Sequence, residues 1–361
     1  LGASVIMSLA LYPYIFLLMK AQIRYLGIPI FKAAKTLGKS DVTVIRTILL
    51  PALKPAIIAG MILAMLETLA DFGGVSTLRI ETFTVAIYNA WFGYQDYFSG
   101  ARLAGILFIF VILLLILSKK LTDSNKIGSI SRDSFDKIPL NKSLGIICFS
   151  ACSLLFLIAF GLPFVQLLVW SDLSETFFSV PNIKLFMNSG FLGFFTASLI
   201  SITALVLSLA YAGSTKMRGI FTAATIGYAL PGSVIAVGLL IVINEILGVS
   251  ITSMGIFGLV LCLSIRFMTP AFQYLISSLE NIPESSKKAL STLPVNSIKA
   301  FTSLYLPSMR PAILVAFLVV FIEVVKEQPA TLILRPVGFC LLYTSDAADD
   351  TPCVDLGGRR I

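Results

Sequence analysis

The chain has 361 residues, of which 57% are hydrophobic and 13% charged, and its mean hydropathy is +0.94. This composition excludes an ordinary soluble domain, and the complete lack of histidine excludes Ser-His-Asp catalysis and imidazole metal sites. In such a chain the net charge of +8 indicates lysine and arginine gathered on the cytoplasmic side of a lipid bilayer, so we expect no nucleic-acid partner.

Apolar runs of about 20 residues recur along the chain, which is the length that a helix needs to cross a bilayer. The runs show no short alternating pattern, and this favours helices over a membrane barrel. The sequence therefore predicts an all-α polytopic membrane protein of about eight helices. We expect the spans near residues 1–19, 56–70, 101–118, 144–169, 189–212, 219–244, 254–276 and 311–328.

The segments between these runs differ in charge. Residues 20–54 contain seven basic residues and one acid, and residues 277–310 are again basic, so both loops are assigned to the cytoplasm. Residues 71–100 are aromatic and nearly balanced in charge, as expected of an outer-face loop lying partly in the interface. Residues 119–142 combine six basic residues with Ser, Asn, Gly and Pro, and this composition predicts a cytoplasmic linker.

The linker divides the chain into two predicted halves. We assign residues 1–118 to the first half and residues 143–339 to the second. The remaining residues, 340–361, are polar, irregular and unable to span a bilayer. We interpret them as a tail that is not native to the protein; a genuine short hydrophilic tail is the alternative.

The two basic loops are copies of one another. With an offset of 256 residues, nine of the 35 paired positions from Ala33/Ala289 to Glu67/Glu323 are identical. Gly38 suits the C-terminus of a short helix, and Pro51 is expected to end a second one before the spanning helix begins. A duplicated membrane unit predicts two homologous helical-bundle halves, with the activity located between them.

This duplicated loop resembles the signature of the permeases of binding-protein-dependent ABC importers, which reads EAA, three residues, Gly, nine residues, Ile, one residue and Leu-Pro. In the first copy the matching residues are Ala33, Ala34, Gly38, Ile48, Leu50 and Pro51. In the second copy Ala289, Leu306 and Pro307 match, Leu293 repeats Leu37, Leu304 replaces Ile, Leu290 replaces the second Ala and Pro294 replaces Gly. Lys32 and Lys288 stand where the signature has Glu, which puts any salt bridge of that Glu in doubt.

Two further segments, residues 71–93 and 326–336, resemble the fused permeases of the ferric-iron importers. The resemblance covers residues 1 to about 339. It implies two six-helix halves in a multi-pass protein of the bacterial inner membrane, truncated here by about three helices at the N-terminus and one at the C-terminus. It also implies that the loops 20–54 and 277–310 couple to a cytoplasmic ABC ATPase dimer, and that a periplasmic iron-binding protein delivers ferric iron for alternating-access transport.

The sequence contains no Gly-rich phosphate-binding loop of the GxxxxGK[ST] type. We therefore expect a transport subunit that is not itself an enzyme and binds no cofactor, with ATP and Mg²⁺ held by the partner ATPase.

Four carboxylates are the candidate translocation path. Glu67 matches Glu323 and Asp71 matches Glu327 in the repeat, and each half places its two acids four residues apart on one helix face. Carboxylates at membrane depth are costly and suit a hard cation such as Fe³⁺. The alternative is that they sit at outer helix ends and meet water. Arg266, in the middle of a span, is expected to be structural and to snorkel or to pair with a carboxylate.

Three other functions remain open from the sequence. A permease of the same class for thiamine, a polyamine or a phosphonate is the nearest alternative. An intramembrane enzyme would have only carboxylates as catalytic groups, since the chain has no histidine. A secondary transporter driven by an ion gradient would also show repeats and buried acids, but duplicated cytoplasmic helix pairs have no role in one.

Overall fold

The structure is a computed structural model. It describes residues 2–26, 34, 36–38, 40–123, 142–170, 180–213, 227–246, 248, 255–283, 285–286, 290, 292, 296–336, 339 and 341. Every regular element in these ranges is helical, and seven helices are long and apolar enough to cross a membrane. The predicted all-α fold is thereby confirmed for the part of the chain that the structure describes.

The chain forms two compact units that cut across the two predicted halves. One unit contains residues 1–71 and 109–176, and the other contains residues 72–108 and 177–361. Residues 72–108, which belong to the first half by sequence, are thus packed with the second half. The linker residues 124–141 and the tail residues 342–361 lie outside the described residues, so the predicted domain boundaries remain predictions.

In the first unit, α1 (Gly2–Leu26) packs against α4 (Leu50–Ala70). The two helices approach closely at Gly60, where an added Cβ would lie 2.8 Å from the backbone Cα of Ile15. Small residues permit such an approach in membrane proteins, where dispersion between packed side chains holds helices together. The same unit contains α8 (Lys142–Phe156), the π-turn η3 (Leu157–Gly161) and α9 (Leu162–Trp170).

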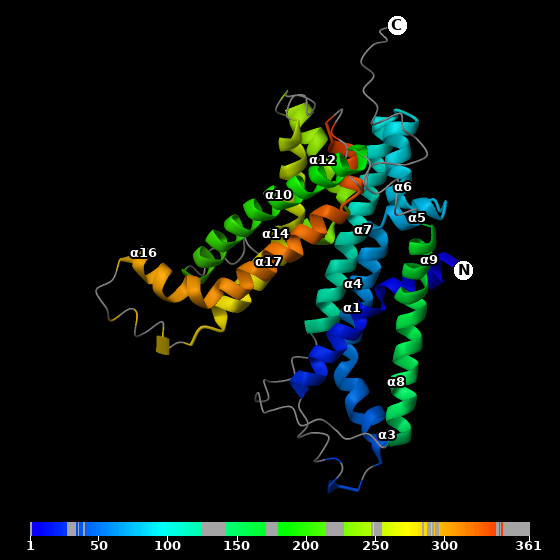
Figure 1. The fold of residues 1–361 in the computed structure, drawn as a ribbon, viewed down its shortest axis with the longest axis vertical. Helices are drawn as coiled ribbons and strands as arrows, with labels where there is room; N and C mark the ends of the chain where they lie inside the picture. Colours follow the sequence, from blue (N-terminus) through cyan, green and yellow to red (C-terminus); the bar gives the residue numbers. More distant parts are fainter. Residues whose placement is uncertain are drawn as a thin grey trace. The chain divides into compact units, whose positions relative to one another are not determined.

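The second unit is built around three long helices that lie side by side in Figure 1: α10 (Val180–Gly213), α14 (Ile256–Glu280) and α17 (Leu306–Lys326). Most buried side chains of α10 are small, and this allows the three helices to pack closely. The small buried residues are Ser189, Thr196, Ala197, Ser201, Ala204 and Ser208. At Gly193 an added Cβ would touch Phe321 and Val325 of α17.

The repeat is visible in the helix boundaries. In the first copy, α3 (Asp41–Val44) and the π-turn η1 (Ile45–Leu49) run directly into α4. In the second copy, α16 (Ser297–Ala300) and η6 (Phe301–Tyr305) run into α17 with the same lengths, 256 residues further on. The expectation that Pro51 ends a helix is wrong, because α4 continues through it. The continuous helix accommodates Pro51, which has no N–H to donate, directly after the π-turn η1.

Residues 71–100 are more helical than expected of a loop. They form α5 (Gly73–Thr77), α6 (Phe83–Tyr88) and the π-turn η2 (Asn89–Gly93) before α7 (Tyr97–Asp123) begins. Asp96 accepts hydrogen bonds from the backbone N–H of Ser99 at 3.0 Å and from its hydroxyl at 2.5 Å. These bonds hold the pKa of Asp96 below its usual value and cap the start of α7.

The span expected at 219–244 is also corrected. The short η4 (Gly227–Ala229) is followed by a break at Pro231, and α12 (Gly232–Ile241) then runs into the π-turn η5 (Val242–Ile246). Proline disfavours helical dihedrals at the preceding residue, which explains why no continuous helix crosses Leu230. Residues 214–226 lie outside the described residues.

The close contact at Gly60 gives a first prediction. Gly60→Ala would drive its Cβ into the backbone of Ile15, and we expect a loss of roughly 1–3 kcal/mol of stability, as for other overpacked cores. Gly105→Ala is the matched control, because it also lies in a spanning helix and an added Cβ there has no atom within 4 Å. Thermal unfolding of the purified proteins in detergent measures both, and equal melting temperatures would contradict the close α1–α4 packing.

Candidate functional site

Two helix breaks meet beside the middle of α14 in the second unit. One break, at Pro231, precedes α12, and the other, at Glu327 and Gln328, separates α17 from α18 (Pro329–Leu334). Both α12 and α18 pack against α14 and against each other. Irregular backbone at membrane depth is tolerated only where protein buries it or where it lines a cavity. Such interrupted helices are also where membrane transporters form their binding sites.

A buried ion pair lies at this junction. Nη1 of Arg266, on α14, donates a hydrogen bond to Oε1 of Glu327 at 3.3 Å. Arg266 is 8% exposed and Glu327 is 6% exposed, so the structure removes both charges from solvent. The expectation that Arg266 pairs with a carboxylate is confirmed. The same Oε1 accepts a second hydrogen bond from the backbone N–H of Ala330 at 3.3 Å, in the first turn of α18.

The position of Arg266 along α14 bears on where Glu327 lies. Arg266 is ten residues after Ile256 and fourteen before Glu280, or about 15 Å and 21 Å from the two helix ends at 1.5 Å per residue. Glu327 is thus level with the middle of a spanning helix, although it follows the last residue of α17. Its side chain is buried and does not meet water in the described part of the chain.

Gly232 makes room for the ion pair. A Cβ at this position would overlap Oε1 of Glu327 and lie against Nη1 of Arg266. Only glycine therefore allows the first turn of α12 to approach both charged groups. The N-terminus of a helix carries partial positive charge from its unpaired N–H groups, so this approach also stabilises the Glu327 carboxylate.

Several polar groups near this junction have no hydrogen-bond partner among the described residues. They include Nε of Arg266, Oγ of Ser233 in the first turn of α12 and Oγ1 of Thr269, one turn after Arg266 on α14. Ser233 is 1% exposed and Thr269 is 5% exposed. Buried polar atoms are normally paired, and exceptions often mark a bound water, an ion or a group that moves.

The other predicted acids are placed separately. Glu323 pairs with Lys326 at 2.8 Å, one turn away on α17, and both side chains are partly exposed. Glu67 is partly exposed on α4, and Asp71 is partly exposed at the C-terminal end of that helix, both in the first unit. No cluster of three or more metal-ligating side chains occurs among the described residues. The convergence of the four carboxylates therefore remains a prediction.

One contact joins equivalent parts of the two repeats within the second unit. Gly73, at the start of α5, lies against the side-chain Oε1 of Gln328, just before α18. Residue 73 and residue 329 are 256 apart, so α5 and α18 occupy matching positions after Asp71 and Glu327. The start of α5 therefore lies against the residue that precedes α18.

The predicted coupling residues are only partly described. Ala34 and Val44 are buried, Gly38 has the left-handed φ of +72° that its predicted role requires, and Ile48 and Leu50 expose 37% and 45% of their surface. Pro51 and Pro307 are exposed in the first turns of α4 and α17, next to Leu306. The other candidates, Ala33, Ala289, Leu293 and Pro294, lie outside the described residues.

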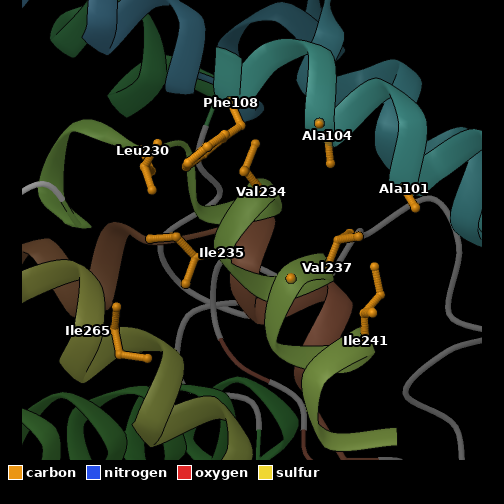
Figure 2. A pocket seen from close by; sticks show the side chains of 11 residues that line it. Ala101, Ala104, Phe108, Leu230, Val234, Ile235, Val237, Ile241 and Ile265 are labelled. Carbon is orange, nitrogen blue, oxygen red and sulfur yellow. The ribbon is translucent and has the colours of Figure 1, made fainter. Parts of the chain in front are cut away.

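A cavity of about 370 Å³ lies on another side of α12 and has apolar walls. Figure 2 shows Ala101, Ala104 and Phe108 of α7 facing Val234, Val237 and Ile241 of α12, with Ile265 of α14 nearby. A hydrated or hard cation would find no oxygen ligand among these side chains. The charged junction and not this cavity is therefore the candidate site for an ion.

Sequence reasoning found Glu327 and Arg266 but missed Gly232 and Ser233. The available signal was the Pro231–Gly232 pair in the middle of an apolar run, which is a strong helix breaker. Cys148 and Cys152 lie on the apolar helix α8, and both are exposed. Apolar residues that face lipid and those that face a protein core have the same pattern in sequence.

The second prediction concerns Gly232. Gly232→Ala would place its Cβ on the carboxylate and separate the ion pair, and breaking a buried pair costs roughly 3–5 kcal/mol. We expect a lower melting temperature in detergent and a lower yield of folded protein. Gly238→Ala, six residues later on α12, is the control because an added Cβ there meets no atom within 4 Å. An unchanged melting temperature for Gly232→Ala would show that α12 does not approach the pair.

The chain is similar to known membrane transport proteins. Residues 1–124 match the family described as binding-protein-dependent transport system inner membrane component. The chain is 26% identical over 343 residues to the Fe(3+)-transport system permease protein FbpB 2 of Haemophilus influenzae, an alignment that covers 92% of this chain and 67% of that protein. It is 21% identical over 356 residues to the ferric transport system permease protein FbpB of Actinobacillus pleuropneumoniae, covering 92% and 52%.

The chain thus spans between about half and two thirds of the lengths of these relatives. No solved structure matches it. The family match includes α1, α4 and the first copy of the loop signature, and seven helices of the described residues are able to cross a membrane. Over residues 1–124 the chain is therefore similar to the inner membrane components of binding-protein-dependent transport systems.

Proposed function

We propose that this chain is a permease subunit of a binding-protein-dependent ABC importer, and that it translocates ferric iron, delivered by a periplasmic binding protein, through alternating access driven by a separate ATPase. The observation that carries the proposal is the carboxylate of Glu327, buried level with the middle of α14 where two helices break. A charge at this depth is costly and is retained in membrane proteins mainly for function. The names of the two relatives, both ferric permeases, support iron as the substrate.

The chemistry of the site favours a hard cation. Carboxylate oxygens are the ligands that such cations prefer, and Glu327 is the buried member of the four predicted acids. The helix breaks supply further oxygen atoms, because carbonyl groups at a broken helix lose their intrahelical partners. Glu327 together with Glu323 would form the second-half wall of the path.

The first half is proposed to supply Glu67 and Asp71 to the same path. Gly73, two residues after Asp71 in the chain, contacts Gln328, one residue after Glu327. The repeat relation and this contact are the grounds for the proposal that the acidic ends of α4 and α17 face one pathway. Their partly exposed side chains remain accessible to a solute.

The duplicated loops are the proposed contact with the ATPase dimer. In both copies a short helix and a π-turn join a spanning helix without interruption, so a push on the loop acts directly on α4 or α17. The four carboxylates lie at the far ends of these same two helices. Binding and closure of the ATPase are therefore expected to move the acidic ends of both halves.

A second substrate class fits the same site. Polyamines and thiamine carry positive charge, and buried carboxylates recognise organic cations as well as metal ions. A phosphonate, being an anion, would be repelled by the four acids, although Arg266 would attract it. The uptake experiment below therefore compares ferric iron with putrescine and thiamine.

The third prediction tests the carboxylate path. The complete reading frame that encodes this chain is co-expressed with its ATPase and binding protein, and ATP-dependent uptake of radiolabelled ferric iron into vesicles is followed. We expect Asp71→Asn combined with Glu327→Gln to lower uptake at least about tenfold, equivalent to about 1.4 kcal/mol. Iron uptake that persists in the double variant would remove the carboxylates from the path, and uptake of putrescine or thiamine in place of iron would change the substrate.

The fourth prediction tests the loops. Ile48→Glu and the repeat-related Leu304→Glu place a charge on the π-turns η1 and η6. We expect the double variant to insert into the membrane but to lose co-purification of the ATPase, and with it uptake. The variant Asp71→Asn with Glu327→Gln is the control, since it should retain the ATPase while failing to transport. Normal ATPase co-purification with the loop variant would show that docking occurs elsewhere.

A further inference from the structure

We propose that Arg266 is a tethered counter-cation, which occupies Glu327 while the pathway is empty and yields the carboxylate to the transported cation. The inference rests on the proposed function, because it requires a cation to pass Glu327. It assigns Arg266 a role in setting affinity, where the sequence indicated only a structural one. Five observations on the junction support it.

The first observation is that the ion pair is loosely made. Arginine and carboxylate groups that serve as structural bridges usually form two parallel hydrogen bonds of about 2.7–2.9 Å. Arg266 and Glu327 form one, at 3.3 Å, between Nη1 and Oε1. The Nε of Arg266 is buried and has no hydrogen-bond partner among the described residues. This geometry neutralises the carboxylate without binding it at full strength.

The second observation is that Glu327 is held in place independently of Arg266. The backbone N–H of Ala330 donates to its Oε1, and the hydroxyl of Thr331 donates to its backbone carbonyl at 2.8 Å. Ala330 and Thr331 are both buried in α18. The carboxylate therefore keeps its position when the guanidinium moves away, which is the preorganisation that a binding site needs.

The third observation concerns the carboxylate oxygens. Both hydrogen bonds that the carboxylate of Glu327 accepts from the described residues go to Oε1. Its other oxygen, Oε2, accepts none from them, which leaves it for a further ligand. A hard cation that approaches Oε2 competes with Arg266 for the same negative charge, because two cations on one carboxylate repel each other.

The fourth observation is that Arg266 has other acceptors close by. Thr269 lies one turn further along α14, and Ser233 follows Gly232, whose Cα lies beside Nη1 of Arg266. Both hydroxyls are buried and unpaired among the described residues. A guanidinium that leaves Glu327 therefore has candidate hydrogen-bond acceptors on its own helix, α14, and on α12, which lowers the cost of its displacement.

The fifth observation is that a carboxylate buried at this depth needs a positive charge beside it. An isolated carboxylate at this depth would either be very costly or would be neutralised by a proton. A permanently exposed negative charge would also bind a trivalent cation too tightly to release it, and passage requires binding that is weak enough to reverse. A cation on a flexible side chain meets both requirements.

The test measures cation binding separately from transport. The probe is terbium(III), a hard trivalent cation whose luminescence rises when it binds protein carboxylates, titrated into the purified full chain in detergent. Removal of the competing charge in Arg266→Gln should tighten the dissociation constant at least about tenfold. Arg266→Lys keeps the charge on a shorter side chain without the planar fork, so it should tighten binding by a smaller factor.

Two controls accompany these variants. Lys299→Gln removes one positive charge from an exposed position on α16 and should leave terbium binding unchanged. Arg266→Gln combined with Glu327→Gln leaves no unpaired charge and should lose the tightened binding. Thermal unfolding identifies variants that do not fold. If Arg266→Gln fails to fold, Arg266→Lys decides the question alone.

The outcomes separate this inference from the proposed function. Terbium binding by both Arg266 variants that equals or is weaker than that of the wild type would overturn the tethered cation, even if the wild type imports ferric iron. Failure of the wild type to import any cation with its ATPase and binding protein would instead overturn the proposed function. In the transport assay, Arg266→Gln should lower KM for iron and also lower the maximal rate, because release becomes slow.

Discussion

The arrangement of the second unit depends on one electrostatic constraint: a carboxylate and a guanidinium are buried together where lipid and protein offer little screening. Each charge alone would be prohibitive there, and each is tolerated because the other is 3.3 Å away. The pair in turn requires the first turn of α12 to carry no side chain, which Gly232 satisfies. The break before α12 and the break after α17 allow these elements to approach the pair.

Much of the helical framework is predictable from sequence because lipid imposes a simple rule on it. An apolar run of sufficient length must be a helix, and seven of the eight predicted spans appear as long helices. The duplication in sequence also predicts that the two copies form the same elements, as α3, η1 and α4 do in one copy and α16, η6 and α17 in the other. The prediction of the eighth span, residues 219–244, was wrong because it ignored Pro231. This proline interrupts the helix even though the residues around it are apolar.

The site was harder to predict, for a different reason. The spacing of Glu323 and Glu327 is readable, but only the fold shows that the two differ: Glu323 pairs with an exposed lysine, and Glu327 is buried against Arg266. Sequence distance gives no measure of the approach of residue 266 to residue 327, nor of Gly73 to Gln328. Such contacts depend on how α14 and α17 pack, and helix packing is set by side-chain shape over the whole interface.

The repeat is regular in backbone but not in charge. Residues 2–19 of α1, the helix that corresponds to α14, contain no charged residue, and Ala70 stands where the second half has Lys326. The second half therefore balances two acids with two bases, whereas these positions of the first half carry two acids alone. A symmetric dimer of second halves would not reproduce this pattern. On the proposed pathway, the acids of the first half would attract a cation, and the charges of the second half would nearly cancel. The duplication thus provides a difference in charge between the halves that two identical subunits cannot have.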